Sequence, residues 1–495
     1  MAGLTSLFKD TVVYGISSIL GRFLNWCLVP LYTYTFAPAE NGIITMMYAV
    51  VAFLIVALTY GMETGFFRFA NRWPQPMAVY STALISLMCT STAFVLLVLC
   101  FLQPVTLWMG CAGHPEYVMI MAVCVAMDAF VSLPFAYLRY TKRPIRFATV
   151  KMINIGFNIG FNLFFLCLCP LLAHHMPYTV NWFYDPQFGV GYIFLANLLA
   201  TFSMFILLLP ELRGFRWTFD GALLRRMLRY SVPLLVLGLA GIMNSTVDKI
   251  IYRFLVPGPE GEAQLGIYGA CFKIAVVMVM FTQAFRFAYE PFIFARAREC
   301  KDPAANKRTY SDAMKYSYLL SLFIFLTVMY YLNIIKYFVA PAYFAGLVVV
   351  PVVLVAELGA GVYYNLTVWY KLTDRTHWGI WFTLIGLAVT LALNIILVPQ
   401  IGYMGCAIAA AASAGAMVLS CYMVGRHYFP IDYQLPRLGV YTLVAGALYV
   451  LGLYILVTDS EWLNYAIRTG LLLLFLIFAL RLEHFPLPHR RQPAG

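Results

Sequence analysis

Apolar segments of about twenty residues, each long enough to cross a lipid bilayer as a helix, follow one another along almost the whole chain. Of the 495 residues, 62% are hydrophobic and only 11% are charged, which is more apolar than a soluble core requires. The pattern predicts an all-α polytopic membrane protein with fourteen transmembrane helices, near 11–32, 43–67, 77–102, 117–138, 147–169, 188–209, 230–255, 266–292, 314–335, 346–370, 378–398, 402–424, 438–457 and 462–481.

The 33 Lys and Arg residues collect in alternate loops, whereas the opposite loops contain only Arg253 and Lys336 beside several acids. Because cytoplasmic loops carry the excess of basic residues, this alternation predicts that both termini lie in the cytoplasm. The same rule explains the net charge of +12, so we expect no nucleic-acid partner.

An internal repeat relates the two halves of the chain. The segment AENGIITMMYAVV around Gly42 resembles AQLGIYGACFKIAVV around Gly266, Asn162 matches Asn394, and Gly189 and Gly191 match Gly402 and Gly405. Since each copy holds six spans, an even number, both copies begin on the same side and form two parallel six-helix lobes, with two helices appended. The expected units are an N-lobe (1–209), a cytoplasmic linker (210–229), a C-lobe (230–424) and a final pair of spans with a cytoplasmic tail (425–495).

The linker is predicted to contain a short amphipathic helix. Asp220 is a plausible N-cap, and the segment from Gly221 to Arg229 places leucines and a methionine on one side and arginines on the other. We expect this helix to lie on the inner leaflet.

Charged residues inside the spans are the candidate functional residues, because charge in a bilayer is costly and is retained mainly for function. Cationic and polar positions suited to an anionic substrate in a central cavity are Arg22, Asn25, Arg68, Lys249, Lys273 and Arg286. The acids that either couple transport to an ion or neutralise these cations are Glu63, Asp128, Asp248, Glu290 and Glu357. Both interpretations remain open for several of them: Arg22 could pair with Glu63, and Arg286 with Glu290, as structural ion pairs.

Catalytic and metal-binding signatures are not found in the sequence. The eleven Cys include no CxxC and no neighbouring His at metal-ligand spacing, there is no phosphate-binding loop, and the loops are too short for a catalytic domain. We therefore expect no enzyme activity, no metal and no cofactor, and H⁺ or Na⁺ as the coupling ion.

Five segments carry a family resemblance: DTVVYGISSILGRFLNWCLVPLYT, YGMETGFFRF, SVPLLVLGLAGIMNSTVDKIIYRFL, GIYGACFKIA and NIILVPQIGYMGCAIAAA. Together they resemble the polysaccharide-biosynthesis (O-antigen, oligosaccharidyl-lipid) flippases of the multidrug/oligosaccharidyl-lipid/polysaccharide (MOP) exporter superfamily, in the form found in Bacteroidetes-type bacteria. The resemblance extends over essentially the whole chain.

The resemblance implies a MATE-like fold in the bacterial inner membrane and alternating access of a central cavity to the two sides. It implies a substrate of undecaprenyl-diphosphate-linked oligosaccharide, moved from the inner to the outer leaflet for cell-surface polysaccharide or lipopolysaccharide synthesis, with headgroup contacts at Arg22, Lys273 and Arg286. It also implies membrane lipids, a polysaccharide polymerase and glycosyltransferases as partners. Two alternatives share the superfamily: a lipid II flippase and a cation-coupled multidrug antiporter.

Overall fold

A computed structural model describes residues 15, 19–176, 178, 182–213, 215, 217–299 and 302–484, and this part of the chain is helical throughout, without β-strands. The first half contains α2 (Val29–Thr35), α3 (Pro38–Thr59), α4 (Met62–Ala70), α5 (Pro76–Cys100), α6 (Leu102–Met109), α7 (Pro115–Tyr140), α8 (Pro144–Leu163), α9 (Cys169–His175) and α11 (Gly191–Leu208). The second half contains α12 (Gly221–Leu255), α13 (Pro259–Glu299), α14 (Pro303–Tyr330), α15 (Leu332–Ile335), α16 (Val350–Leu366), α17 (Val368–Leu372), α18 (His377–Ile401), α19 (Tyr403–Tyr428), α20 (Leu435–Val450) and α21 (Glu461–His484).

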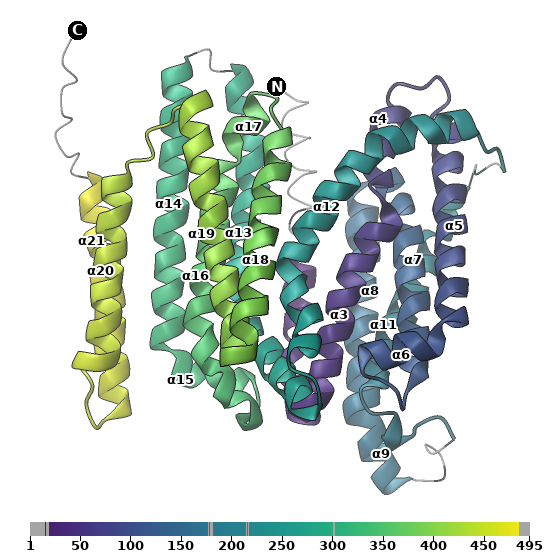
Figure 1. The fold of residues 1–495 in the computed structure, drawn as a ribbon, viewed down its shortest axis with the longest axis horizontal. Helices are drawn as coiled ribbons and strands as arrows, with labels where there is room; N and C mark the ends of the chain where they lie inside the picture. The colour runs from purple at the N-terminus through teal and green to yellow at the C-terminus, as the bar shows by residue number, and fades with distance from the viewer. Residues whose placement is uncertain are drawn as a thin grey trace.

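The helices form two bundles that stand side by side (Figure 1). We call α3 to α11 the first bundle and α13 to α19 the second bundle. The long helix α12 crosses between them, and α20 and α21 stand as a separate pair on the outer flank of the second bundle. This arrangement confirms the predicted fold class of two helical lobes with two appended helices.

Thirteen helices in the described part of the chain are long and apolar enough to cross a membrane. Fourteen were predicted, and the difference is the first span, near 11–32, much of which lies outside the described residues. Residues 19–26 are helical, and α2 follows after a short turn. The chain is thus a multi-pass membrane protein.

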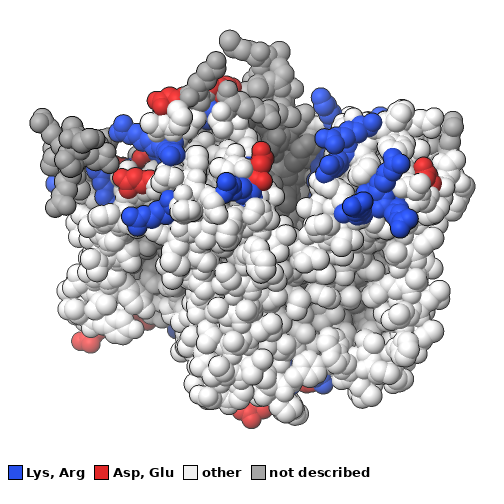
Figure 2. Space-filling model, turned by 45° about the horizontal axis from the view of Figure 1, so that its top comes forward, with Lys and Arg blue, Asp and Glu red and all other residues white. Residues whose placement is uncertain are grey.

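Charge is concentrated at one end of both bundles. Figure 2 shows Lys and Arg gathered along the top of the molecule, above a flank that is almost free of charge. We call this end the basic face; it carries the basic ends of α4, α7 and α12, and the other end is the opposite face. The uncharged flank between the two faces is the surface expected to meet lipid hydrocarbon.

The predicted span 43–67 is broken in the structure. Tyr60 and Gly61 both adopt left-handed backbone conformations, with φ of 34° and 69°, and they separate α3 from α4. Such a conformation cannot continue an α-helix, so α4 forms a separate segment at the basic face.

The linker helix is not a separate element. Asp220 caps it as predicted, accepting hydrogen bonds from the backbone nitrogens of Ala222 and Leu223, but the helix then continues without interruption to Leu255 as α12. Its first turns bury Leu223 and Met227 against the first bundle instead of resting on the bilayer surface. The apolar side of the segment therefore joins the two halves of the protein.

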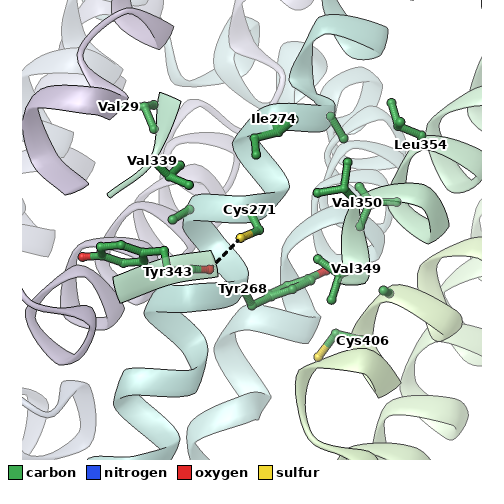
Figure 3. Packing of buried hydrophobic residues seen from close by; sticks show 14 of the residues in the cluster. Val29, Tyr268, Cys271, Ile274, Val339, Tyr343, Val349, Val350, Leu354 and Cys406 are labelled. Carbon is green, nitrogen blue, oxygen red and sulfur yellow. Dashed lines mark hydrogen bonds between the residues drawn. The ribbon is translucent and has the colours of Figure 1, made fainter. Parts of the chain in front are cut away.

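The two bundles meet tightly at the opposite face, where the start of α3 crosses the start of α13. A Cβ atom built on Gly42 would lie 2.1 Å from the carbonyl oxygen of Glu262, and one on Gly266 would lie 1.9 Å from that of Pro38. Figure 3 shows the neighbouring core, in which Val29 from α2 joins Tyr268 and Tyr343 from the second half. The Tyr343 hydroxyl donates a hydrogen bond to the Phe36 carbonyl at 2.7 Å, across the contact between the halves.

The internal repeat is visible in the backbone. Gly189 (φ 49°, ψ −125°) and Gly402 (φ 59°, ψ −142°) share a conformation that is essentially restricted to glycine, and each is followed within two residues by a long helix. Asn162 and Asn394 are both buried, and each donates from Nδ2 to the carbonyl four residues earlier, at 2.7 Å. Positions paired by sequence thus have the same local structure.

Candidate functional site at the junction of the two bundles

The first helical segment, residues 19–26, lies between the bundles. A Cβ on Gly21 would meet the Ile155 side chain of α8 at 2.6 Å, and Asn158 of α8 donates a hydrogen bond to Asn25 Oδ1 at 3.2 Å. On its other side, the Trp26 indole nitrogen donates to the Lys273 carbonyl of α13 at 2.7 Å. Arg22 and Asn25 therefore lie on a segment that contacts α8 of the first bundle and α13 of the second bundle.

Arg22 and Arg286 approach one aromatic side chain, Tyr364 of α16. The Arg286 guanidinium lies over the Tyr364 ring at 5.0 Å, and Tyr364 is also an electrostatic neighbour of Arg22. Arg22 and Arg286 are both exposed, and Arg22 forms no ion pair with any described residue. Two of the predicted substrate contacts, from different halves of the chain, are thus brought together.

Arg286 shares its acid with a second cation. Glu290 accepts from Arg286 Nε at 3.1 Å and from Lys371 Nζ at 2.6 Å. The predicted pairing of Arg286 with Glu290 is therefore present, but one carboxylate faces two cations. A net positive charge is left at this place, which suits an anionic ligand.

Lys273 and Lys249 lie in a different environment, nearer the opposite face. Lys249 pairs with Asp248 at 2.9 Å, and Asp248 also accepts from the Tyr268 hydroxyl at 2.8 Å. Lys273 is exposed, has Lys249 as an electrostatic neighbour and forms no ion pair with a described residue. The Asp248 carboxylate is therefore occupied by Lys249, whereas the Lys273 charge is available to a ligand.

The sequence allowed an ion pair between Glu63 and Arg22, but this pair is not formed. Glu63 pairs with Arg139 at the basic end of α7, because the break at Tyr60 and Gly61 turns α4 toward α7. Arg68 lies on the same short helix, where its guanidinium stacks over the Tyr230 ring of α12 at 4.0 Å. Arg68 is thus placed at the rim of the basic face, against the helix that crosses between the bundles.

Asp128 and Glu357 are the two acids of the predicted set that form no ion pair among the described residues. Asp128 accepts a hydrogen bond from Thr201 Oγ1 at 3.2 Å, and Glu357 has Lys249 as an electrostatic neighbour. A carboxyl group without a fixed cation can take up and release a proton without breaking a salt bridge. In this respect the two acids differ from Glu63, Asp248 and Glu290, each of which forms an ion pair.

Lys151 of α8 was missed by the sequence reasoning. It has Arg22, Glu63, Asp128 and Arg139 as electrostatic neighbours and forms no ion pair among the residues described. A signal was present in the sequence, since Lys151, Ile155, Asn158 and Asn162 follow helical spacing along one side of α8. The last three contact Gly21, Asn25 and Tyr32, so this side of α8 faces the first helical segment.

The two halves carry equivalent ion pairs near the basic face. In the first half Glu63 pairs with Arg139, and in the second half Glu290 pairs with Lys371. Each pair joins the basic end of the second helix of a repeat to that of the fourth. In the described part of the chain, no group of three or more His, Cys, Asp or Glu residues is arranged to hold a metal ion.

The described residues thus form a two-lobed helical fold with charged side chains at the junction of the lobes. A similar fold is found in solved structures: the lipid II flippase MurJ in an inward closed conformation aligns with a TM-score of 0.74, over 95% of this chain and 100% of that chain, at 12% sequence identity. A multidrug resistance MATE family transporter aligns in its inward-facing conformation with a TM-score of 0.67, over 87% of this chain and 99% of that chain, at 13% identity.

An outward-facing MATE family structure aligns less well, with a TM-score of 0.56, over 89% of this chain and 99% of that chain, at 14% identity. Neither a protein-family model nor a curated protein matches the sequence. At these identities the similarity establishes the fold of the chain, which is that of the MurJ and MATE transporters.

Proposed function

We propose that the chain is a flippase that moves undecaprenyl-diphosphate-linked oligosaccharide from the inner to the outer leaflet by alternating access. The observation that carries this proposal is that two arginines from opposite halves of the chain have Tyr364 as a neighbour: Arg286 lies over its ring, and Arg22 is close enough to interact with it electrostatically. A bare charge at the bilayer centre costs about 2.5–3.5 kcal/mol on insertion scales, so Arg22, which has no ion pair among the described residues, and the excess positive charge that Arg286 and Lys371 leave at Glu290 need a compensating anion or water. A diphosphate supplies that anion, and Arg binds phosphate in bidentate fashion.

The positive-inside rule supports the assignment of the basic face and of both termini to the cytoplasm, and the proposed substrate supports a location in the inner membrane. The tight contact of Gly42 and Gly266 joins the bundles at the opposite face, which supports the proposal that this state is closed to the outside. The better alignment with the inward-facing MATE structure than with the outward-facing one supports the same assignment. The headgroup enters from the cytoplasm, binds between the bundles, and leaves after the contact between α3 and α13 opens.

Return of the empty transporter is driven by a cation gradient, with Asp128 and Glu357 as the proposed H⁺ or Na⁺ sites because neither is held by an ion pair. Membrane lipids, a polysaccharide polymerase and glycosyltransferases are the proposed partners, since the latter two make and consume the same lipid-linked glycan. The proposed reaction is transport and includes no covalent chemistry.

Lipid II transport is the second candidate function, and the alignment with MurJ over that protein's whole length favours it. Both candidates involve a lipid-linked sugar diphosphate, and they differ in the glycan. A multidrug antiporter with cationic substrates is less compatible with a junction that gathers Arg22, Arg286 and Lys273. Complementation of a strain depleted of its lipid II flippase separates the two flippase candidates.

The test is flipping of a labelled undecaprenyl-diphosphate oligosaccharide in proteoliposomes that contain wild-type protein, Arg22→Ala or Lys273→Ala. We expect transport by the wild type and loss of transport in both variants, with unchanged thermal unfolding. Lys336→Ala is the matched control, since the Lys336 ammonium lies near the rings of Tyr337 and Phe344 and not at Tyr364. Absence of diphosphate-lipid transport together with gradient-driven uptake of cationic drugs would assign the chain to the antiporters.

A further inference from the structure

A small cavity lies within the second bundle, between α13, α14, α16 and α17, next to the junction. Its walls are largely aromatic and apolar, including Phe281 and Phe285, and Arg286, Glu290 and Lys371 also line it. Tyr364, over which Arg286 stacks, is a further lining residue. The cavity therefore adjoins the place where the substrate phosphate is proposed to bind.

Two buried polar atoms of the residues that line this cavity have no hydrogen-bond partner among the described residues: Asn365 Oδ1 and the Tyr289 hydroxyl. The Asn365 side chain is 5% exposed and that of Tyr289 is 8% exposed. Asn365 Nδ2 donates to Ser317 Oγ at 2.9 Å and to the Gly361 carbonyl at 3.0 Å, which fixes the amide and leaves Oδ1 as an acceptor without a donor. Buried polar groups without partners are uncommon in folded proteins, and a bound ligand is one explanation for them.

The chemistry of the cavity selects a secondary amide. Asn365 Oδ1 requires an N–H or O–H donor, and the Tyr289 hydroxyl can donate to a carbonyl. The free volume is about 30 Å³, and since a buried water needs roughly 10–15 Å³ by this measure, the cavity has room for a small substituent but not for a sugar ring. A secondary amide with a methyl group brings one donor, one acceptor and one apolar end.

We propose that this cavity binds the acetamido group of the sugar attached to the diphosphate, so that the transporter selects lipid-linked N-acetylated sugars. This inference rests on the proposed function, which places the diphosphate at Arg22 and Arg286. The acetamido N–H donates to Asn365 Oδ1, its carbonyl accepts from the Tyr289 hydroxyl, and its methyl group contacts the aromatic wall.

Other small groups fit the cavity less well. A carboxylate brings no donor for Asn365 Oδ1, and an ammonium group meets the positive charge of Arg286 and Lys371. A lipid tail leaves both polar atoms unpaired, and a lone hydroxyl group has no apolar part that could pack against the aromatic wall. A sugar that carries a hydroxyl in place of the acetamido group is therefore expected to bind more weakly.

The test is a competition between two probes for the purified full-length protein in lipid nanodiscs. The probes are undecaprenyl diphosphate carrying a single N-acetylglucosamine and the same lipid carrying a single glucose. We expect wild-type protein to prefer the acetamido probe by about tenfold, the effect of one or two hydrogen bonds that a competitor leaves unmade.

Tyr289→Phe is the informative variant, because it removes a hydroxyl that bonds to nothing among the described residues and so should leave stability unchanged. We expect it to reduce the preference severalfold, and Asn365→Leu to abolish it. Tyr330→Phe is the matched control: its hydroxyl donates to the Leu448 carbonyl at 2.6 Å, away from the cavity, so stability should fall while the preference remains.

Equal binding of the two probes by wild-type protein would overturn the inference and leave the proposed function intact. A preference that survives in both Tyr289→Phe and Asn365→Leu would also overturn it, because the cavity would then not be the site of selection. Absence of binding of either diphosphate lipid would overturn the proposed function, and this inference with it.

Discussion

Gly42 and Gly266 lie against each other at the crossing of α3 and α13, where a Cβ on Gly266 would stand 2.7 Å from the Gly42 backbone nitrogen. These residues hold equivalent positions in the two repeats. The contact that closes the opposite face is thus made by the same position of each half, and it requires that both lack a side chain.

Substitution of Gly266 by Ala should push the two bundles apart at the opposite face. Its new methyl group would lie 1.9 Å from the Pro38 carbonyl, so we expect a loss of about 1–3 kcal/mol in stability, typical of overpacking. Gly446→Ala in α20 is the control, since its Cβ would have nothing within 4 Å. The measurement is thermal unfolding in one detergent; equal stability of the two variants would contradict the close contact.

Lys151→Met should weaken binding of a diphosphate lipid about tenfold, because it removes a cation that neighbours Arg22 and has no ion pair among the described residues. Lys336→Met is a close match: Lys151 stacks near the rings of Phe135 and Phe147, and Lys336 near those of Tyr337 and Phe344, each at 5.2–5.5 Å. The measurement is lipid binding in nanodiscs. Equal loss in both variants would show that the effect is not specific to the junction.

Asp128→Asn and Glu357→Gln should abolish the response of transport to a cation gradient while leaving transport down a lipid gradient. The physical reason is that neither carboxyl is neutralised by a fixed ion pair, so each can exchange its charge during the cycle. Flipping in proteoliposomes with and without an imposed H⁺ or Na⁺ gradient measures this.

Glu63→Gln is the control for that experiment, because Glu63 is paired with Arg139. It should keep gradient coupling and lose roughly 1 kcal/mol of stability or less, since both partners are partly exposed. Loss of coupling in Glu63→Gln alone would reassign the ion site.

Cys111 should report the opening of the opposite face. It lies in the turn before α7, is 3% exposed, and adjoins Gly110, on which the Arg253 guanidinium of α12 rests. Burial raises the pKa of the Cys111 thiol to about 11, so in this state the thiolate is scarce at pH 7. We expect slow labelling by an external maleimide in a variant whose exposed cysteines are replaced.

Arg253→Ala should speed this labelling, because it removes the side chain that covers Gly110. The matched control is Lys249→Ala, one turn earlier on α12, because among the described residues Lys249 pairs with Asp248 and not with the turn that holds Cys111. Labelling that is already fast in the parent variant would contradict a closed opposite face.

Lys315→Met should destabilise the attachment of the two final helices. Lys315 is 4% exposed and pairs with Glu483 of α21 and with Asp312, so its removal leaves the partly buried Glu483 carboxylate with the Tyr441 hydroxyl as a neutral partner, at a cost of about 1–3 kcal/mol. Adding Glu483→Leu should recover most of the loss. Proteolysis of the α20–α21 pair measures both variants, and additive losses would contradict the pairing.

Hydropathy was enough to predict the order of the thirteen spans found in the described residues, because lipid requires each crossing to be a long apolar helix, and the internal repeat was enough to predict the two-lobed plan. Hydropathy failed at Tyr60 and Gly61, where two left-handed residues break a span without interrupting its hydropathy. It also failed at α12, since the apolar side of an amphipathic segment can pack on protein as well as on lipid.

The candidate charges could be found from the sequence, but their partners could not. By their predicted depth in the membrane, Glu63 could have paired with Arg22. The turn of α4 directs Glu63 to Arg139 instead. Lys151 was overlooked because a lone lysine near the end of a span is common, and its neighbourhood with Arg22 depends on the packing of two helices far apart in sequence.

The sequence by itself determined that the chain crosses the membrane many times, that its halves are related, and where charge lies along each helix. These properties are local, because each follows from the residue composition of about twenty consecutive positions. The tertiary structure decided which charges neutralise one another, which remain available to a ligand, and which face is closed. Those properties depend on contacts between distant segments, such as Gly42 with Gly266 and Arg286 with Tyr364, which no local pattern encodes.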